Sequence, residues 1–394
     1  MGGITDKVAV VGMGCTKFDE HWDKSIEDLA VEAAYEAFED AGVSSRDINA
    51  AWWGTVDGGE LGRTLGRFLK LEYIPITRVE NRCATGSDAF RNACFAVAAG
   101  MYDMVLVLGA EKLKDSGMAS AGFDPRQPYT SRLDTVIHPP AAFAQLARRY
   151  QHHYHLTYDE LKRALGLIAV KNHHNGSLNP KAQFQQEVAL ERAINAPMVA
   201  HPLGLFDCCG VSDGAAAAIL TRPEIARRMR EDYVLVKGIG QVSGAFQNRL
   251  RSEYDLVHLE EVFRSSRDAY EQAGIKDPRN ELDLAIVHDC FTITEMVICE
   301  DLGFSERGKA REDIEEGVFA LEGEIPVNTD GGLKCFGHPL GASGLRMLYE
   351  VYKQLQDKAD KRQIKNARLG LAHAFGGTPV DSGVSTVIIL GRKD

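Results

Sequence analysis

Short apolar runs alternate with longer segments of helical periodicity along most of this chain. The run at 8–14 reads VAVVGMG, and the segment at 25–41 repeats apolar side chains every three or four positions. Ser25 before that segment and Gly42 after it are typical helix boundaries. A buried strand followed by a helix is the unit of α/β proteins, so the pattern predicts mostly parallel strands connected by helices.

The same pattern occurs a second time. VLVKGIG at 234–240 repeats the first strand, and AYEQAG at the end of 259–274 repeats the AFEDAG that ends the first helix. Each copy then continues through a strand, a helix and another strand. These later elements are 50–54, 85–100 and 105–110 in the first copy and 284–288, 341–355 and 369–374 in the second. Repeats of this kind predict two α/β halves related by duplication.

An irregular segment separates the two copies. It is richer in Pro, His, Gln and Asn than the rest of the chain, and we interpret it as an inserted, mostly helical cap. The predicted organisation is an N-terminal α/β half at 1–112, a cap at 113–231 and a C-terminal α/β half at 232–394. Duplication alone does not indicate function, so the chemistry has to be sought where strands end and helices begin.

Composition excludes several classes of protein. The chain has 45 Lys and Arg against 56 Asp and Glu, a net charge of −11, which argues against binding nucleic acid through bulk charge. The longest apolar runs are far shorter than the roughly 18 residues that cross a bilayer. Eight cysteines without a CxxC pair suggest reduced thiols. We therefore expect a cytoplasmic protein.

Two helix starts that correspond in the duplication carry reactive side chains. Cys83 precedes the helix at 85–100, and His338 precedes the helix at 341–355. The N-terminus of a helix favours a thiolate, and a thiolate is a strong nucleophile. The pseudo-symmetry predicts that these helix starts meet, with Cys83 as nucleophile and His338 as base. Taken alone, each residue also fits a purely structural role: Cys83 as a buried, unreactive thiol and His338 as an imidazole that caps a helix.

Two more groups of candidate residues lie where strands end, which is where sites collect in α/β proteins. His288 and Cys290 belong to the sequence HDCF, and His373 precedes Gly376 and Gly377. A thiol at this edge can transfer a proton, and an imidazole can donate to a developing oxyanion. Glycines allow backbone N–H groups to approach a ligand closely.

Together these motifs resemble those of the thiolase superfamily. NTDGG at 328–332 runs into GHPLGASG at 337–344, which is similar to the thiolase signature, and Cys83 stands where the acyl-accepting cysteine stands. KNHHN at 171–175 and DCCGVSDGAA at 207–216 are further family-like stretches. Conventional members carry NEAF where this chain has HDCF at 288–291, and a second cysteine in a CxGG turn where this chain has His373. Both differences are similar to those in the sterol-carrier-protein branch.

The resemblance covers nearly the whole chain and implies a fold as well as an activity. The implied fold is α/β, with two duplicated five-stranded mixed-sheet halves in αβαβα layers and an inserted, mostly helical cap. The implied enzyme is an acyl-CoA C-acyltransferase, similar to acetyl-CoA acetyltransferase. It would cleave a 3-ketoacyl-CoA with coenzyme A, as in β-oxidation, or run the reverse Claisen condensation.

The resemblance also implies roles for individual residues. Cys83 would carry the acyl group after His338 takes its proton. Cys290 would protonate the departing enolate, and His288 would stabilise the enolate oxygen. Coenzyme A would be the co-substrate, and no metal is implied in this chain. Oxyanion and substrate contacts are expected from a second set of residues: His373, Gly376, Gly377, Ser343 and His138.

Two other functions stay open at this point. One is a thiolase-like retro-aldolase acting on a CoA thioester, and the other is a non-catalytic acyl-CoA-binding subunit. Cys83 argues against the retro-aldolase, because such relatives lack the nucleophilic cysteine. A binding subunit needs no reactive thiol and imidazole at symmetric helix starts, so the complete set of Cys83, His288, Cys290 and His338 argues against it. The resemblance further implies a homodimer or homotetramer and a small zinc-ribbon/OB-fold partner protein. The acyl group cannot be read from the sequence: an acetoacetyl, a branched or medium-chain, or an aryl group as in benzoylsuccinyl-CoA would all fit. The residues that bind the CoA phosphates and the physiological direction are equally open.

Overall fold

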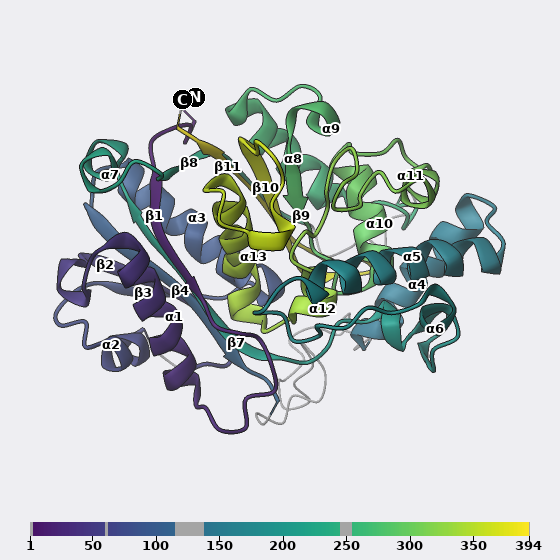
Figure 1. Ribbon diagram of the computed structural model, residues 1–394, viewed down its shortest axis with the longest axis horizontal. Helices are drawn as coiled ribbons and strands as arrows, with labels where there is room; N and C mark the ends of the chain where they lie inside the picture. The colour runs from purple at the N-terminus through teal and green to yellow at the C-terminus, as the bar shows by residue number, and fades with distance from the viewer. Residues whose placement is uncertain (1–2, 60–61, 115–137, 245–253, 394) are drawn as a thin grey trace.

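A nine-stranded mixed sheet forms the centre of the computed structural model, which describes residues 3–59, 62–114, 138–244 and 254–393. The strands lie in the order β3-β2-β4-β7-β1-β8-β11-β10-β9 (Figure 1). The first five in this order are β3 (Ile76–Val79), β2 (Ala50–Gly54), β4 (Met104–Lys112), β7 (Asp213–Thr221) and β1 (Ala9–Cys15). The other four are β8 (Val234–Ser243), β11 (Ser382–Arg392), β10 (Leu369–Thr378) and β9 (Leu284–Ile286).

The order and direction of pairing are the same on both sides of the contact between β1 and β8. Outward from β1, β7 and β4 join antiparallel, and β2 and β3 then join parallel. Outward from β8, β11 and β10 join antiparallel, and β9 joins parallel. A parallel bridge between Ala285 and Val327 extends this side further. The middle of the sheet is therefore less parallel than the sequence pattern predicts, in part because β11 follows β10 through a short turn.

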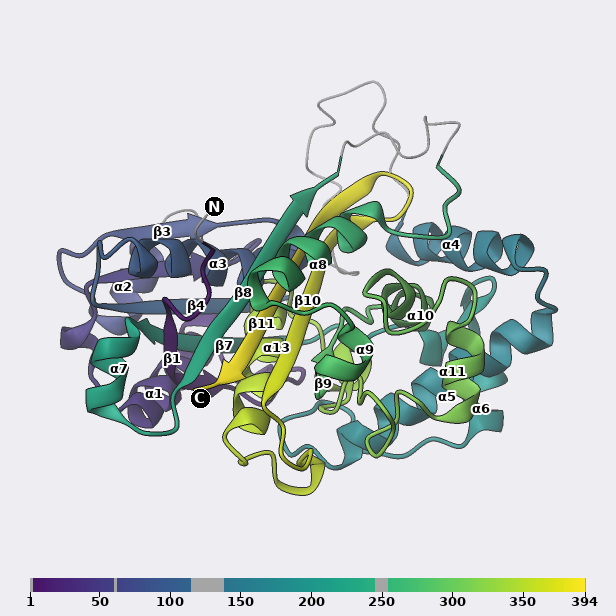
Figure 2. The ribbon, with the colours of Figure 1, turned by 90° about the horizontal axis from the view of Figure 1, so that it is seen from above.

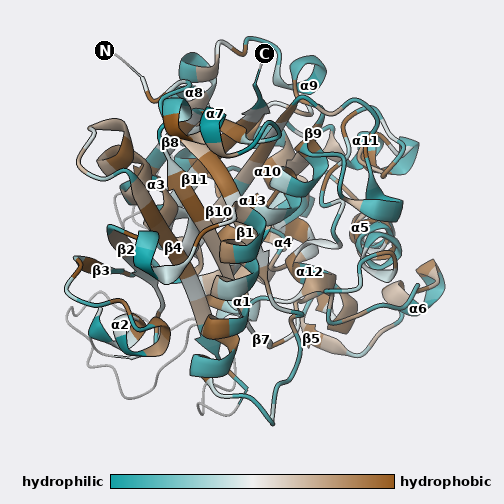
Figure 3. Cartoon of the chain, turned by 60° about the vertical axis from the view of Figure 1, so that its left-hand side comes forward, coloured by the Kyte–Doolittle hydropathy of each residue, from teal (hydrophilic) through white to brown (hydrophobic). Residues whose placement is uncertain are grey.

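Helices cover the sheet in layers. On the outer faces α1 (Ile26–Ala41) packs on β1 and β7, and α8 (Glu260–Ala273) packs on β8 and β11. Between the two halves lie α3 (Thr85–Ala98) and α13 (Leu340–Leu355), which contact each other. Because α13 touches β4 and β7 on one side and β10 on the other, these two helices form the middle layer. In Figure 3 the strands β4 and β11 are hydrophobic, whereas α5 (Tyr158–Ser177) is hydrophilic on its outward side.

Most of the remaining elements gather at one end of the molecule. Figures 1 and 2 both place β2, β3 and the short α2 (Arg63–Leu69) at the opposite end from α4, α5 and α6. The elements not yet given are α4 (Pro139–His153), α6 (Leu190–Ile194), β5 (Met198–Ala200), β6 (Leu203–Gly204), α7 (Pro223–Met229), α9 (Pro278–Glu281), α10 (Thr292–Asp301), α11 (Ala310–Glu316) and α12 (Gly332–Phe336). Within the described part of the chain, no helix combines the length and apolarity needed to span a membrane.

One part of the predicted cap is not a cap. The segment at 213–221 forms β7, a fully buried strand between β4 and β1 in the main sheet. Its sequence, DGAAAAILT, has no polar and apolar alternation because both faces of the strand are covered. A run of alanines of this kind does not distinguish a buried strand from a buried helix. This strand completes the five-stranded side of the sheet.

The start of α3 approaches the start of α13 closely enough to require glycine. A β-carbon on Gly344 would lie 2.5 Å from the backbone nitrogen of Ser87, and one on Gly86 would lie 2.7 Å from the carbonyl oxygen of Gly341. Real β-carbons do not come this close to backbone atoms. The contact brings together the two segments that precede these helices, which are the segments that contain Cys83 and His338.

We predict that Gly344→Ala destabilises the protein by about 1–3 kcal/mol, the usual cost of forcing extra atoms into a packed interior. The free energy of unfolding, measured with denaturant, checks this value. Gly66→Ala in α2 is the matched control, because its β-carbon would meet the flexible Cδ1 tip of Ile76 at 3.0 Å and the carbonyl oxygen of Leu71 at an ordinary contact distance of 3.5 Å. Alanine is the better helix former, so the control is expected to be neutral or stabilising. Equal stability of the two variants would contradict the close approach.

Candidate active site

Cys83 lies in the tight turn that leads into α3. It is the middle residue of a single 3-10 turn, η2 (Arg82–Ala84), which runs directly into the helix. Arg82 has a left-handed backbone with a φ of 49°, and such conformations cluster at functional sites. The Cys83 side chain packs against an apolar group around the turn: Val56, Leu113, Val211 and Leu340.

Two imidazoles face the thiol of Cys83. The Cys83 Sγ and one ring nitrogen from each of His288 and His338 all lie within 4.8 Å of one another. The two rings meet edge to face, with their centroids 5.3 Å apart, and both residues are buried. The structure therefore brings together three of the four residues to which the resemblance assigns catalytic roles. These three residues come from three separate segments of the chain.

Hydrogen bonds around His338 determine which nitrogen is available as a base. Its Nδ1 lies 2.8 Å from the Ser343 hydroxyl, and that hydroxyl donates its single proton to the carbonyl oxygen of Pro339 at 2.8 Å. Ser343 must therefore accept a hydrogen bond from Nδ1–H. His338 Nε2 is left unprotonated, and it has no hydrogen-bond partner among the described residues. Ser343 thus acts by orienting the base.

Burial makes both members of the Cys83–His338 pair neutral at rest. It raises the pKa of the Cys83 thiol to about 12, although the Arg82 charge and the backbone N–H of Cys83 act in the opposite direction. Burial, with help from the Arg346 charge, lowers the pKa of His338 to about 3. Loss of solvation therefore outweighs the preference for a thiolate that the helix N-terminus provides.

Cys290, the fourth of these residues, is a protonated thiol. Burial raises its pKa well above the ordinary value, and the neighbouring thiols of Cys209 and Cys83 raise it further. Its Sγ lies 3.9 Å from the Thr294 hydroxyl. A buried thiol that keeps its proton close to Cys83 is suited to donating that proton to a reacting carbon.

Asp289 fixes the HDCF loop to the start of α12. Its carboxylate accepts hydrogen bonds from the backbone N–H of Leu333 at 2.6 Å and of Lys334 at 3.2 Å. It also accepts one from the Asn172 amide at 2.8 Å. Burial and the nearby Glu295 charge raise the pKa of Asp289, and the two backbone hydrogen bonds act in the opposite direction. Because α12 leads directly to the GHP segment, this carboxylate holds the Cys290 loop and the His338 segment in one position.

The second set of predicted residues is divided between the cluster and the surface. His373 is buried with its Nε2 3.1 Å from the Ser385 hydroxyl, and its charge influences the pKa of His288. A β-carbon on Gly376 would lie 3.2 Å from the backbone nitrogen of Cys83, so this backbone touches the nucleophile turn. Gly377, with a φ of 142°, follows it. His138 is the exposed N-cap of α4, and its role stays a prediction.

One strip of chain supports the site through its backbone, and the sequence predicts no such contact. Along 209–212, the backbone N–H of Cys209 donates to the carbonyl of Cys290 at 2.9 Å, and Val211 packs against the same Leu113–Leu340 cluster as Cys83. The Ser212 hydroxyl accepts from the backbone N–H of His338 at 3.2 Å. The family-like stretch at 207–216 was the only sequence signal for this strip. Its adjacent cysteines lack the spacing of metal ligands, and nothing in the stretch indicated that it contacts the HDCF loop.

Thiol and imidazole groups are also the usual ligands of zinc. The type and number of their ligand atoms would allow Cys83, His288 and His338 to hold a metal ion. However, His338 Nε2 is positioned as a free base, and the same three groups suffice for nucleophilic catalysis without a metal.

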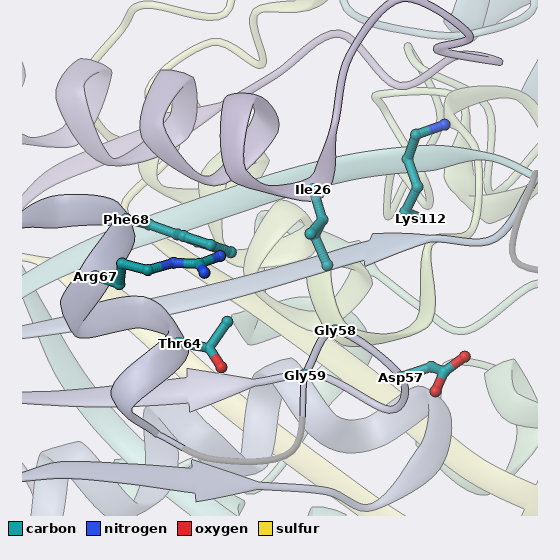
Figure 4. Close-up of a pocket in the computed structure, with 8 residues that line it drawn as sticks. All are labelled: Ile26, Asp57, Gly58, Gly59, Thr64, Arg67, Phe68 and Lys112. Atoms are coloured by element: carbon teal, nitrogen blue, oxygen red, sulfur yellow. The ribbon is translucent and has the colours of Figure 1, made fainter.

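A separate surface cavity of about 460 Å³ shares no lining residue with this cluster (Figure 4). It is lined by Ile26, Asp57, Gly58, Gly59, Thr64, Arg67, Phe68 and Lys112.

Comparison with protein families assigns nearly the whole chain. Residues 8–224 match the family described as thiolase, N-terminal domain, and residues 243–392 match the family described as thiolase C-terminal domain-like. The acetyl-CoA acetyltransferase of Methanothermobacter thermautotrophicus is 38% identical over 391 residues, which cover 98% of this chain and 99% of that protein.

Two further relatives extend the similarity. Sterol carrier protein 2 of Gallus gallus is 32% identical over 94% of this chain and 70% of its own length. The structure of the Ltp2-ChsH2(DUF35) aldolase matches with a TM-score of 0.84 at 27% identity, and covers 99% of this chain and 98% of that one. The chain belongs to the thiolase superfamily and is similar to its acetyl-CoA acetyltransferase and sterol-carrier-protein members.

Proposed function

We propose that this protein is a thiolase-type acyl-CoA C-acyltransferase that forms an acyl-enzyme on Cys83. The observation that carries the proposal is the placement of the Cys83 Sγ within 4.8 Å of imidazole nitrogens of His288 and His338. A nucleophile, an oriented base and an oxyanion donor in one buried cluster are what acyl transfer through a covalent intermediate requires.

Acylation is the first half of the proposed reaction. His338 Nε2 takes the proton of Cys83 while the sulfur bonds to the 3-keto carbon of a 3-ketoacyl-CoA. Because thiol and imidazole are both neutral at rest, the proton moves as the carbon–sulfur bond forms. Backbone N–H groups of Cys83 and of 375–377 are the proposed donors to the tetrahedral oxyanion, which they stabilise without reorganisation.

Carbon–carbon cleavage and release of the acyl group follow. The bond between C2 and C3 breaks, and its electron pair forms the enolate of the departing acyl-CoA. His288 and the protonated His338 donate to the enolate oxygen, and Cys290 gives its proton to C2. The Cys290 thiolate then takes the proton of coenzyme A, whose sulfur attacks the thioester. The bond between the acyl carbon and the Cys83 sulfur breaks, and the released Cys83 thiolate takes back its proton from His338. Run backwards, the same steps are a Claisen condensation.

The substrate and partners are proposed from the resemblance to thiolases. Coenzyme A is the co-substrate, consistent with the CoA thioesters that thiolases use. The acyl group is proposed to be aryl or branched, as in benzoylsuccinyl-CoA, or a simple acetoacetyl group. A cytoplasmic homodimer or homotetramer with a small zinc-ribbon/OB-fold partner is proposed, and the second component in the name of the similar aldolase structure, ChsH2(DUF35), supports such a partner.

A retro-aldolase on a CoA thioester is the second candidate. The TM-score of 0.84 to an aldolase structure favours it, since the fold accommodates that chemistry. An aldol cleavage transfers no acyl group to a thiol, whereas the proposed transferase must. Covalent capture of substrate on Cys83 therefore distinguishes the two activities directly.

We predict that Cys83→Ala abolishes acyl-enzyme formation and lowers kcat by about 10⁴-fold or more, because no other group can carry the acyl chain. Intact-protein mass spectrometry after mixing with acetyl-CoA or acetoacetyl-CoA measures the adduct. Cys94→Ala, which removes a buried thiol from α3, the helix that follows Cys83, is the control and keeps the adduct. An adduct of unchanged mass on the Cys83 variant would exclude Cys83 as nucleophile.

Cys290→Ala is expected to keep acylation by acetyl-CoA partly intact but to slow turnover by about 10²–10⁴-fold, the range that a general acid contributes. Adduct formation is followed by mass spectrometry and turnover by release of free CoA. Cys299→Ala in α10 removes a buried thiol that has no proposed role and should turn over normally. Normal turnover by the Cys290 variant would show that another group acts as the general acid.

The raised pKa of Cys83 and the lowered pKa of His338 predict a neutral pair at neutral pH. The ultraviolet thiolate absorbance of the wild type minus that of Cys83→Ala should then be absent at neutral pH and appear only in strong alkali. Since His338 stays unprotonated below the ordinary histidine range, the acylation rate should not fall as pH drops through that range. A thiolate signal at neutral pH would show an ion pair instead.

A further inference from the structure

A third thiol lies beside the catalytic thiols, at the point where the 209–212 strip crosses the HDCF loop. Cys208 and Phe291 form an antiparallel bridge, and the backbone N–H of Cys209 donates to the carbonyl of Cys290 at 2.9 Å. In this register Cys209 stands directly opposite Cys290. Nothing in the proposed reaction uses the Cys209 side chain.

The register places the two cysteines opposite each other across two adjacent strips of chain. Directly opposed residues of a hydrogen-bonded antiparallel pair have Cα atoms about 5.5 Å apart, which is within the range of about 4.4–6.8 Å that a disulfide spans. Their side chains lie on the same face, with Cβ atoms about 4.5–5.5 Å apart, whereas a disulfide needs about 3.5–4.5 Å. The Cβ atoms must therefore move about 1 Å closer for the bond to close.

The electrostatics are consistent with neighbouring sulfur atoms. Among the charges that raise the pKa of Cys290, the Cys209 thiol has the largest effect and Cys83 the next. The Sγ of Cys208, the adjacent cysteine, lies 3.4 Å from the carbonyl of Gly204. Of the two adjacent cysteines, Cys209 is thus the one that faces the catalytic thiols.

We propose that Cys209 and Cys290 form an oxidation-sensitive pair that a peroxide converts into a disulfide. One sulfur attacks the peroxide oxygen to give a sulfenic acid and water, and the other sulfur then displaces a second water to close the S–S bond. A dithiol reductant returns two electrons and two protons and restores both thiols. The nucleophile Cys83 is left unmodified.

The consequence for activity rests on the proposed function. With Cys290 in a disulfide, its proton is no longer available to the departing enolate, whereas His338 and Cys83 remain in place. The oxidised protein should therefore still accept an acetyl group from acetyl-CoA but lose turnover by about 10²-fold or more, as when a general acid is removed. Reduction should restore the full rate.

The test uses the whole protein treated with hydrogen peroxide and then with an alkylating reagent. The expected result is an intact mass lower by two hydrogen atoms per chain before alkylation, two fewer alkyl groups per chain after alkylation of the denatured protein, and a cross-linked peptide that joins Cys209 to Cys290. Dithiothreitol should remove both. Cys209→Ser should show neither change. It should turn over at the rate of the untreated wild type, both before and after peroxide treatment. Cys208→Ser is the matched control and should behave as the wild type does.

Other outcomes overturn the proposal. A cross-link between Cys83 and Cys290, a link to Cys208, or over-oxidation without any cross-link would each exclude the pair. So would reversible inactivation of Cys209→Ser to the same extent as the wild type. Because the cross-link is read by mass, it stands even if no acyl-enzyme forms on Cys83. A failure of the proposed function is thus distinguishable from a failure of this pair.

Discussion

The close contact between the starts of α3 and α13 is the constraint on which the site depends. Glycine at positions 86 and 344 lets the two backbones approach more closely than any side chain would allow. The helices come from different halves of the chain, so their meeting converts two distant motifs into neighbours. Cys83 and His338 each lie just before one of these helices, and the packing of the middle layer therefore sets the distance between nucleophile and base.

Burial is the second physical theme of the site. Removal from water keeps thiol and imidazole neutral against the pull of the helix dipole, and it keeps Cys290 protonated. Charges buried nearby are paired: Arg346 bonds to Asp330, and Asp289 accepts three hydrogen bonds. These polar groups join the cluster to α5 and α12, as expected if unpaired charges in the interior are costly. The reactive groups are thus held still while they remain uncharged.

Local signals in the sequence account for most of the fold. The Ser25 cap, the Gly42 stop and the apolar periodicity between them predict α1 within one residue. The repeated strand and helix pattern anticipates the matching order of strands on the two sides of the sheet. The segment at 213–221 escaped prediction because a strand buried on both faces shows no alternation. Its antiparallel pairing with β1 and β4 depends on partners that lie more than a hundred residues away in the chain.

The sequence by itself determined which residues can react and at which helix starts and strand ends they stand, because residue chemistry and local periodicity are written along the chain. Tertiary structure decided their protonation states, since desolvation depends on neighbours from the whole fold. It also selected Nε2 of His338 as the base, through the hydroxyl of Ser343. Only the crossing of two strips of chain placed Cys209 opposite Cys290, because such pairing is a contact between segments and has no local signature in either.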